Sequence, residues 1–343
     1  MNRVSLIAVL ACACSSASHP PEGGVPEASL DATAPADAAA PRDARAPEDA
    51  SAMDGGPRPP CPMAPPADYV YELGVSVFGD NDYIEYIPGD LPIVLSAPHG
   101  GELEPDELVR DPDSLAMDAQ SLTTTRLVME AFRARTGHIP HVIVNHVRRD
   151  RLNLNRADAT PNADVPSAMQ AFEDFHGFIE DAEAWVTAAC GRGHYFDMHT
   201  NGGEPRWVEV GIALSKESLA LEGPAFEALA PMSTYRTLAE RVDISFEQLV
   251  RGEQSLGGLL EARAVLAVPS DASPNAGESD YFTGGYNVRR HGSRDGGVID
   301  GSQMEIHFAY INSGAETREA FARDFTSVIQ DFMRIHYGFD LGR

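Results

Sequence analysis

The sequence predicts an α/β fold, a three-layer sandwich with a mixed, largely parallel central sheet. Short apolar runs typical of strands alternate along the chain with longer segments whose apolar residues recur at helical spacing. The two longest helical segments of the first 200 residues each end in a glycine, which is typical of a helix C-cap. Hydrophobic residues make up 43% of the 343 residues, enough for a sizeable core.

The expected elements begin at residue 69, where apolar and polar residues start to alternate as in antiparallel strands. The string "LPIVL" then predicts a buried strand that ends just before His99. In chain order, strands are expected within 69–79, 82–90, 91–97, 139–147, 194–200, 206–214, 264–270 and 302–312. Helices are expected within 117–137, 167–193, 235–250 and 317–338.

The first 66 residues differ in composition from the rest. Arg3 precedes an apolar run over 4–11 that is too short to span a bilayer and has the form of an export signal. Val9-Leu10-Ala11-Cys12 resembles a bacterial lipobox with Cys12 as the lipidated residue, whereas an ordinary signal would be cleaved near Ala17. Residues 15–66 are rich in Ala, Pro and Asp and predict a disordered tether.

This pattern predicts three segments: an export signal with lipobox over 1–14, a tether over 15–66 and a folded domain over 67–343. The protein is then exported and held in the cell envelope by a lipid anchor. The formal net charge of −26 argues against nucleic acids and anionic membrane surfaces as electrostatic partners.

The residue types present exclude some catalytic chemistry. Lys216 is the one lysine in the chain, so a phosphate-binding Gly-Lys-Ser/Thr loop is absent. No Gly-x-Ser-x-Gly string marks a nucleophilic serine. Cys61 and Cys190 lie outside the signal region and either pair in a disulfide or remain lone thiols, with Cys190 a weak candidate nucleophile.

A metal site is predicted where the strand before His99 ends. In His99-x-x-Glu102 the two side chains can lie on one side of a tight turn, and Gly100 and Gly101 permit a sharp bend. An imidazole and a carboxylate suit Zn²⁺, which takes three protein ligands in catalytic sites. His199, in "YFDMHTN", is the best candidate for the third ligand.

Other histidines are interpreted as structural or exposed, namely His138, His141, His176 and His336. His194 lies an odd number of residues before His199, so on a strand the two side chains point to opposite faces. Asp197 shares the face of His199 and could orient its ring, although it could equally be a turn residue at the strand end.

Glu305 lies in the middle of an apolar strand, with Gln303 on the same face. Burying a carboxylate there is costly unless it has a partner. We interpret Glu305 as the general base and acid of a hydrolase, and a salt-bridged core carboxylate is the alternative. Since His99, Arg149 and His199 all lie near the carboxyl ends of predicted strands, a common edge of the sheet is expected to hold the site.

The string "HVRRDRLNLNRAD" places arginines at the same predicted edge. Arginine binds carboxylates in a bidentate manner, so one or two of these side chains could hold a substrate carboxylate or polarise its carbonyl. The polar residues of this string include Arg149, Asn153, Asn155 and Arg156.

Five strings in this order resemble the N-formylglutamate amidohydrolase family, within the zinc carboxypeptidase-like hydrolases: "SAPHGGE", "RRDRLNLNR", "DMHTN", "GGYNVRRHGS" and "SQMEI". The resemblance spans roughly residues 85–310. It implies the zinc carboxypeptidase and phosphorylase/hydrolase-like fold. It also implies Zn²⁺ on His99, Glu102 and His199, with Glu305 as the catalytic carboxylate.

The same resemblance implies substrate-positioning roles, for Arg149, Asn155 and Arg156 in one string and for a loop with Gly285, Tyr286 and Arg290 in another. Asn153 stands where the family has an aspartate. Formylglutamate hydrolysis belongs to cytoplasmic histidine breakdown, whereas this chain carries an export signal. We therefore take the expected fold and reaction class from the family, but not its substrate.

The sequence thus predicts a zinc-dependent hydrolase of amide bonds in N-acyl amino acids or short carboxylate-bearing peptides. Glu305 and Arg149 are its expected catalytic residues, and Asp197 and Gln303 support them. Two alternatives remain: an extracytoplasmic carboxypeptidase or cell-wall peptide amidase, and a tethered binding protein without catalysis.

Overall fold

The computed structural model describes residues 69–112, 117–159 and 161–342. The export signal, Cys12, the tether and the boundary expected at residue 67 lie outside these residues. Within them, every helix is too short or too polar to cross a lipid bilayer.

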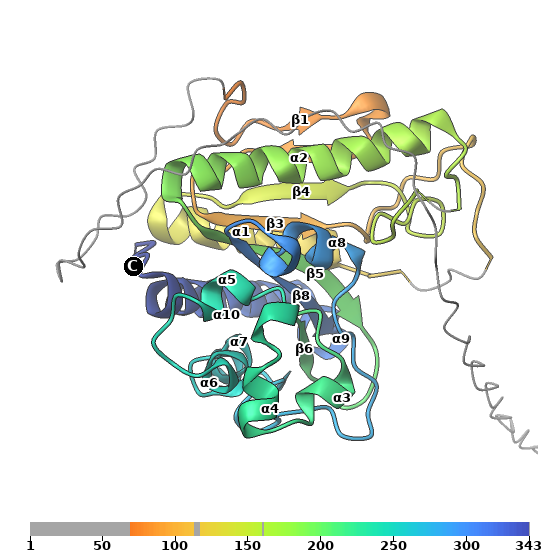
Figure 1. Cartoon of the computed structure of the whole chain (residues 1–343). Helices are drawn as coiled ribbons and strands as arrows, with labels where there is room; N and C mark the ends of the chain where they lie inside the picture. Colours follow the sequence, from red (N-terminus) through yellow and green to blue (C-terminus); the bar gives the residue numbers. More distant parts are fainter. Residues whose placement is uncertain (1–68, 113–116, 160, 343) are drawn as a thin grey trace, which may run out of the picture. The chain divides into compact units, whose positions relative to one another are not determined.

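Eight strands form one sheet (Figure 1). They are β1 (Val77–Phe78), β2 (Ile84–Ile87), β3 (Ile93–Ala97), β4 (His141–Asn145), β5 (Gly193–Asn201), β6 (Val208–Gly211), β7 (Ala267–Val268) and β8 (Ile299–His307). Their order across the sheet is β1-β2-β4-β3-β5-β8-β6-β7. The central strands β4, β3, β5 and β8 are parallel, whereas β2 and β6 run antiparallel to the neighbours that join them to this block. The predicted α/β architecture with a mixed sheet is confirmed.

Three long helices cover the sheet: α1 (Ser121–Thr136), α2 (Pro166–Cys190) and α10 (Ala315–Phe332), which continues into a π-helical turn at Met333–Tyr337. The short helices are α3 (Lys216–Leu219), α4 (Gly223–Glu227), α5 (Arg236–Ala239), α6 (Phe246–Arg251), α7 (Leu256–Glu261), α8 (Tyr286–His291) and α9 (Phe308–Ile311). Three 3₁₀ turns lie at Asp80–Asp82, Ala230–Met232 and Ser293–Asp295.

The core is divided by the sheet into two parts. Strand β3 shows this division, because Ile93 and Leu95 pack with residues of α1 and α10 while Val94 packs with residues of α2. Alternate side chains of a strand point to opposite faces, so both faces of β3 are buried. In Figure 1, α2 runs across one face of the sheet, and α3–α7 gather beside β6.

Two of the long helices end at a glycine, as the sequence suggests. Gly137 after α1 and Gly191 after α2 adopt the left-handed conformation, and each donates its backbone N–H to the preceding turn. The C-cap expected at Gly137 is confirmed, and the second helix ends at Gly191, two residues before the glycine that closes its predicted segment.

Several predicted elements differ in extent. The strand expected within 69–79 is only Val77–Phe78. The single helix expected over 235–250 is two helices, because Ser245 begins α6 with a capping box that it shares with Gln248. The strand expected over 302–312 ends at His307, whose Nδ1 accepts the backbone N–H of Ala309 and begins α9.

Cys190, the last residue of α2, is disulfide-bonded. The sequence left a Cys61–Cys190 disulfide and two lone thiols as alternatives, and Cys61 lies outside the described residues. Because a disulfide sulfur is not a thiolate, Cys190 is not a catalytic nucleophile, and that weak candidate is set aside.

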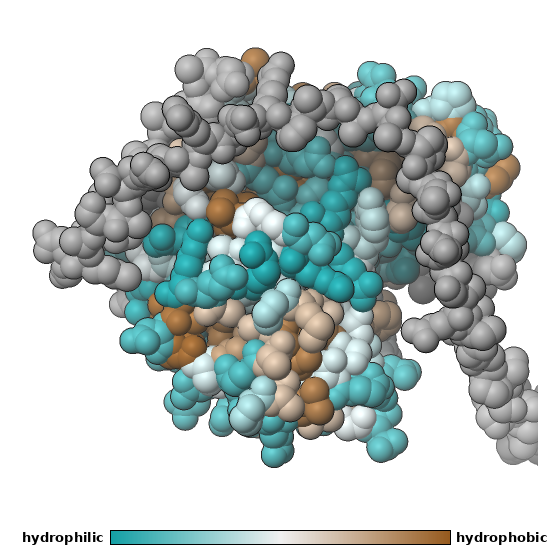
Figure 2. All heavy atoms as spheres, viewed as in Figure 1, coloured by the Kyte–Doolittle hydropathy of each residue, from teal (hydrophilic) through white to brown (hydrophobic). Residues whose placement is uncertain are grey.

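The surface carries few large apolar groups. Figure 2 shows that hydrophilic residues cover most of the coloured surface in this view. Small patches of apolar residues lie over the region of α4–α7. Exposed apolar residues of that region are Leu221, Met232 and Ile244. Single exposed apolar residues are normal and imply no interface.

Gly101 fixes the path of the chain after His99. A Cβ on Gly101 would lie 2.2 Å from the backbone carbon of His146, and Leu103 then pairs with Val147. We expect Gly101→Ala to destabilise the fold by roughly 1–3 kcal/mol, because the overlap is with backbone atoms that cannot move freely. Urea unfolding should show a lower midpoint.

Gly177→Ala is the matched control for Gly101→Ala. Gly177 lies inside α2 with no heavy atom within 4 Å of its ideal Cβ. Alanine in a helix interior is favoured over glycine, so this variant should gain about 0.5–1 kcal/mol. A Gly101→Ala midpoint equal to the wild type would contradict the close packing.

Candidate metal centre and cavity

Three buried side chains converge at the carboxyl ends of β3 and β5. His99 follows β3, His199 lies on β5, and Asp118 precedes α1. Each offers one ligand atom, and the three atoms lie within 4.8 Å of one another. The hydroxyl of Ser121, the first residue of α1, donates to the carbonyl of His99 at 2.7 Å and ties the segment of Asp118 to β3.

The hydrogen bonds orient both imidazoles toward one carboxylate oxygen. Oδ2 of Asp118 lies 3.3 Å from Nδ1 of His99 and 2.7 Å from Nδ1 of His199. The opposite nitrogens are held from behind: Nε2 of His99 lies 2.9 Å from Oδ1 of Asn153, and Nε2 of His199 lies 2.9 Å from Oδ2 of Asp197. Metal-ligating histidines typically use their second nitrogen in this way. The cluster therefore fits a divalent metal ion.

The electrostatics of the cluster fit a bound cation as well. Burial alone would raise the pKa of Asp118, but His99 and His199 outweigh it and hold that pKa well below its usual value. Burial opposes the charge of His199, yet Asp197 and Asp118 raise its pKa well above the ordinary value. Burial lowers the pKa of His99. The carboxylates of Asp118 and Asp197 stay ionised because the positively charged ring of His199 lies between them. A bound metal ion would supply positive charge at the same place.

The structure brings together two of the three predicted ligands and leaves out Glu102. Glu102 is exposed and is not part of the cluster, because the packing of Gly101 on the backbone of His146 carries the chain away from His99 instead of folding it into a tight turn. Asp118, 19 residues after His99, provides the carboxylate. Its one sequence signal is an aspartate just before a helix, which is also typical of an ordinary N-cap.

Asp197 connects the cluster to a buried network beneath it. While Oδ2 lies against His199, its Oδ1 accepts the hydroxyl of Ser96 at 2.6 Å. The same hydroxyl lies 2.6 Å from the phenol oxygen of Tyr195. These contacts fix the carboxylate and, through it, the ring of His199.

Glu305 lies on β8 directly opposite His199 on β5. It is 5% exposed and accepts a hydrogen bond from Nε2 of Gln303 at 2.8 Å. Oε1 of Gln303 in turn accepts the backbone N–H of Gly285. Burial raises the pKa of Glu305 to about 8, although the positive charge of His199 opposes this.

Arg149 joins the cluster from the segment after β4. Its Nη1 donates to Oδ1 of Asp118 at 2.7 Å, and its side chain is 30% exposed. Asn155 lies on the same side, with Nδ2 3.3 Å from Nε2 of His199. A Cβ on Gly285 would lie 2.2 Å from that Nδ2, so the close approach requires glycine.

A cavity of about 700 Å³ opens beside the cluster. Six predicted site residues line it: Arg149, Asn155, His199, Gly285, Gln303 and Glu305. Asp118 lines it too, and residues 200–204 and 280–285 form its walls. The arrangement offers a cluster that fits a metal ion, a buried carboxylate and a guanidinium beside one cavity, which suits polarisation of a carbonyl and proton transfer beside it.

Three predicted substrate-binding residues do not line this cavity. Arg156 is exposed. Tyr286 packs near Phe172 and His176, with ring centroids at 6.3 and 5.6 Å. Arg290 pairs with an exposed glutamate, Glu180, at 2.7 Å. The loop turns into α8 after Gly285, so the later side chains lie on the far side of that turn.

The remaining histidines make contacts elsewhere. The two nitrogens of His194 contact Tyr337 and Ser302, each at 2.9 Å, away from the cluster. Of the histidines interpreted as structural or exposed, His138 lies against Asp90, His141 against Tyr86, His176 against His291 and His336 against the carbonyl of Gln254.

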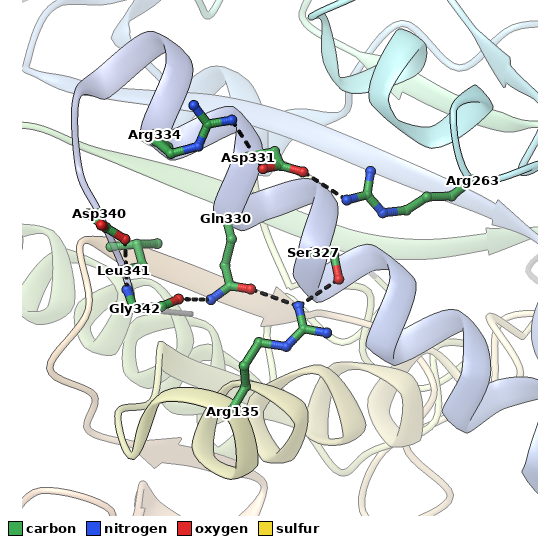
Figure 3. Close-up of a pocket in the computed structure, with 9 residues that line it drawn as sticks. All are labelled: Arg135, Arg263, Ser327, Gln330, Asp331, Arg334, Asp340, Leu341 and Gly342. Atoms are coloured by element: carbon green, nitrogen blue, oxygen red, sulfur yellow. Dashed lines mark hydrogen bonds and ion pairs between the residues drawn. The ribbon is translucent and has the colours of Figure 1, made fainter.

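A second cavity of about 310 Å³ lies between α1, α10 and the end of the described chain (Figure 3). Its arginines are already engaged, Arg135 with Ser327 and Gln330, and Arg263 and Arg334 with Asp331. No histidine or cysteine among the described residues lines it, and the hydroxyl of Ser327, which does line it, accepts a hydrogen bond from Arg135. The metal cluster and Glu305 lie elsewhere, at the first cavity.

No protein-family model and no curated protein sequence matches this chain. Among solved structures, it is similar to N-formylglutamate amidohydrolase from Ralstonia eutropha JMP134, at 14% identity and a TM-score of 0.44, over 75% of this chain and 99% of that one. A gene product of Agrobacterium tumefaciens matches at 16% identity and a TM-score of 0.43, over 71% and 89%. A candidate metallopeptidase from Shewanella amazonensis SB2B matches at 12% and 0.29, over 74% and 81%. At these identities and TM-scores, the similarities assign neither a family nor an activity to this chain.

Proposed function

We propose that this chain is a zinc-dependent hydrolase of amide bonds in N-acyl amino acids or short carboxylate-bearing peptides. The observation that supports it is the position of Glu305, opposite His199 in register and lining the same cavity as Asp118 and His199 of the His99–Asp118–His199 cluster. A metal cluster that only stabilised the fold would need neither a cavity nor a second carboxylate beside it.

The donor set of two imidazoles and one carboxylate suits zinc in a catalytic site. His99, Asp118 and His199 would hold the ion, and Asn153 and Asp197 would keep the two rings oriented. When bound, zinc polarises a substrate carbonyl and makes water more acidic.

Glu305 has the role of proton carrier in this proposal. Its carboxylate takes a proton from the attacking water and delivers it to the leaving amine nitrogen as the C–N bond breaks. Gln303 holds one oxygen of Glu305 at 2.8 Å and so leaves the other for this transfer.

Arg149 orients the substrate. One N–H of the Arg149 guanidinium donates to Asp118. The rest of the guanidinium is partly exposed and lines the cavity. It can bind the substrate carboxylate or the oxygen that gains negative charge during attack.

Metal analysis and an activity panel test the proposed function. Plasma-emission analysis of the purified protein should find about one zinc per chain. The panel comprises N-formyl and N-acetyl amino acids, dipeptides and tripeptides. Chelation should abolish turnover, and added zinc should restore it.

Metal-loaded, folded protein that turns over no member of the panel would contradict the hydrolase and favour a binding protein. Turnover that persists after complete removal of the metal would contradict the metal dependence. Release of the C-terminal residue of the peptides, without cleavage of N-acyl amino acids, would favour the carboxypeptidase alternative.

A further inference from the structure

Glu209 is a buried carboxylate that the proposed amide hydrolysis does not use. It lies on β6 directly opposite Glu305, which in turn lies opposite His199 on β5. Residues paired in this way point to the same face of a sheet, so the three side chains form a row across three strands. With strands spaced about 4.8 Å apart, Glu209 lies roughly 10 Å from His199 along this row.

Within the described part of the chain, no cationic side chain forms an ion pair with Glu209. It is 4% exposed, and its carboxylate accepts hydrogen bonds from two neutral donors, the indole N–H of Trp207 at 3.3 Å and the backbone N–H of Phe282 at 2.7 Å. Burial raises its pKa. A buried carboxylate without a counter-charge is costly, and a bound cation would relieve that cost.

Asn201 has an unused acceptor next to this row. It is 7% exposed, lines the cavity and lies on the face of β5 that carries His199. Its Nδ2 donates to the carbonyl of Glu305 at 2.8 Å, while its Oδ1 has no hydrogen-bond partner among the described residues. A buried acceptor without a donor is costly, so this oxygen marks a place for a donor on a ligand.

The charges around the cavity differ between its two ends. Arg149 lines the end at the metal cluster, where it is held by Asp118. Glu209 and the exposed Asp280 line the other end, together with Phe282, which is 50% exposed. The carboxylates and the aromatic side chain at this end can each attract a cation.

We propose that the cavity selects substrates that carry a cationic group, an ammonium or guanidinium, which binds against Glu209 and Asn201. This inference rests on the proposed function, because it names the substrate class of that site. The substrate carboxylate faces Arg149 and its scissile amide faces Glu305, so the substrate resembles an N-acylated basic amino acid or a short peptide that contains one.

The test compares two substrates that differ in one ammonium group. N-Formyl-L-lysine and N-formyl-L-norleucine share the same aliphatic chain, and the metal-loaded wild type should prefer the lysine compound in kcat/KM. Glu209→Gln retains the volume of the side chain and removes its charge. It should lower the lysine-to-norleucine ratio by roughly tenfold or more, as expected for the loss of a charged hydrogen-bond partner.

Two further variants make the result specific. Glu278→Gln removes an exposed charge from the same loop without touching the cavity, so it should leave the ratio unchanged. Asp280→Asn, at an exposed position that cannot disturb the core, should lower the ratio in the same direction as Glu209→Gln but by a smaller factor.

Calorimetry separates the two proposals if neither compound is hydrolysed. N-Formyl-L-lysine should then bind the metal-loaded wild type more tightly than N-formyl-L-norleucine, and Glu209→Gln should abolish this difference. That result would support the cationic subsite even though the hydrolase proposal fails. Equal turnover and equal binding of both compounds would overturn the subsite. So would a second zinc equivalent that Glu209→Gln removes, because the carboxylate would then be a metal ligand.

Discussion

Glu305→Gln is expected to lower kcat by roughly 10²–10⁴-fold, the usual contribution of a general acid–base group. Glutamine fills the same space beside Gln303 but cannot take a proton from water. Metal content should stay at the wild-type level, because Glu305 is not among the three residues of the cluster. Steady-state kinetics and plasma-emission analysis on the same preparation check both statements.

Glu305→Asp is the matched control, since it retains the carboxylate and shortens its reach. Its kcat should fall less than that of Glu305→Gln, because the proton can still be transferred over a longer distance. If both variants turned over substrate at the wild-type rate, Glu305 would have no part in the chemistry. If both variants lost the same factor in kcat, the exact position of the Glu305 side chain would matter and its ability to transfer a proton would not.

Asp118→Asn is expected to weaken metal binding at least about 100-fold, beyond the effect typical of residues that only support a ligand. The amide keeps the shape of the side chain but removes the negative charge that faces Nδ1 of both His99 and His199. Competition with a chromogenic chelator measures the affinity, and circular dichroism with urea unfolding verifies that the variant is folded.

Glu102→Gln is the comparison that decides which carboxylate belongs to the site. The exposed Glu102 lies outside the cluster, so its replacement should change metal affinity less than about threefold, within the range of surface charge effects. Loss of metal from Glu102→Gln with retention in Asp118→Asn would reverse the ligand assignment.

Most of the fold could be predicted because periodicity and caps are local signals. The apolar runs of β3, β4 and β5 and the glycines after α1 and α2 stand out in the sequence. The antiparallel direction of β6 could not be predicted, since direction depends on where the connecting segment crosses the sheet. The break at Ser245 was missed because apolar spacing continues across it, while capping by Ser245 and Gln248 begins a new helix there.

The site residues that could be predicted from the sequence are those near the ends of strands with a clear apolar pattern. His99, His199, Arg149 and Glu305 all lie near the carboxyl ends of strands, and the structure brings them to one place. Asp118 lies in a turn without a pattern of its own. Its position depends on Ser121 binding the carbonyl of His99 and on the close packing of Gly100 against Ser121 and the carbonyl of Asp118, and both are long-range contacts that short spacing cannot reveal.

The antiparallel course of β6 has a consequence for how this chain could be re-engineered. The groups proposed for bond cleavage come from the parallel strands and their following segments, whereas Glu209 enters the row from a strand that runs the other way. Changes on β6 are therefore expected to alter which compounds are accepted. Because the charge of Glu209 also raises the pKa of Glu305, replacing it is expected to shift the pH dependence of turnover as well, so selectivity and pH profile would have to be tuned together.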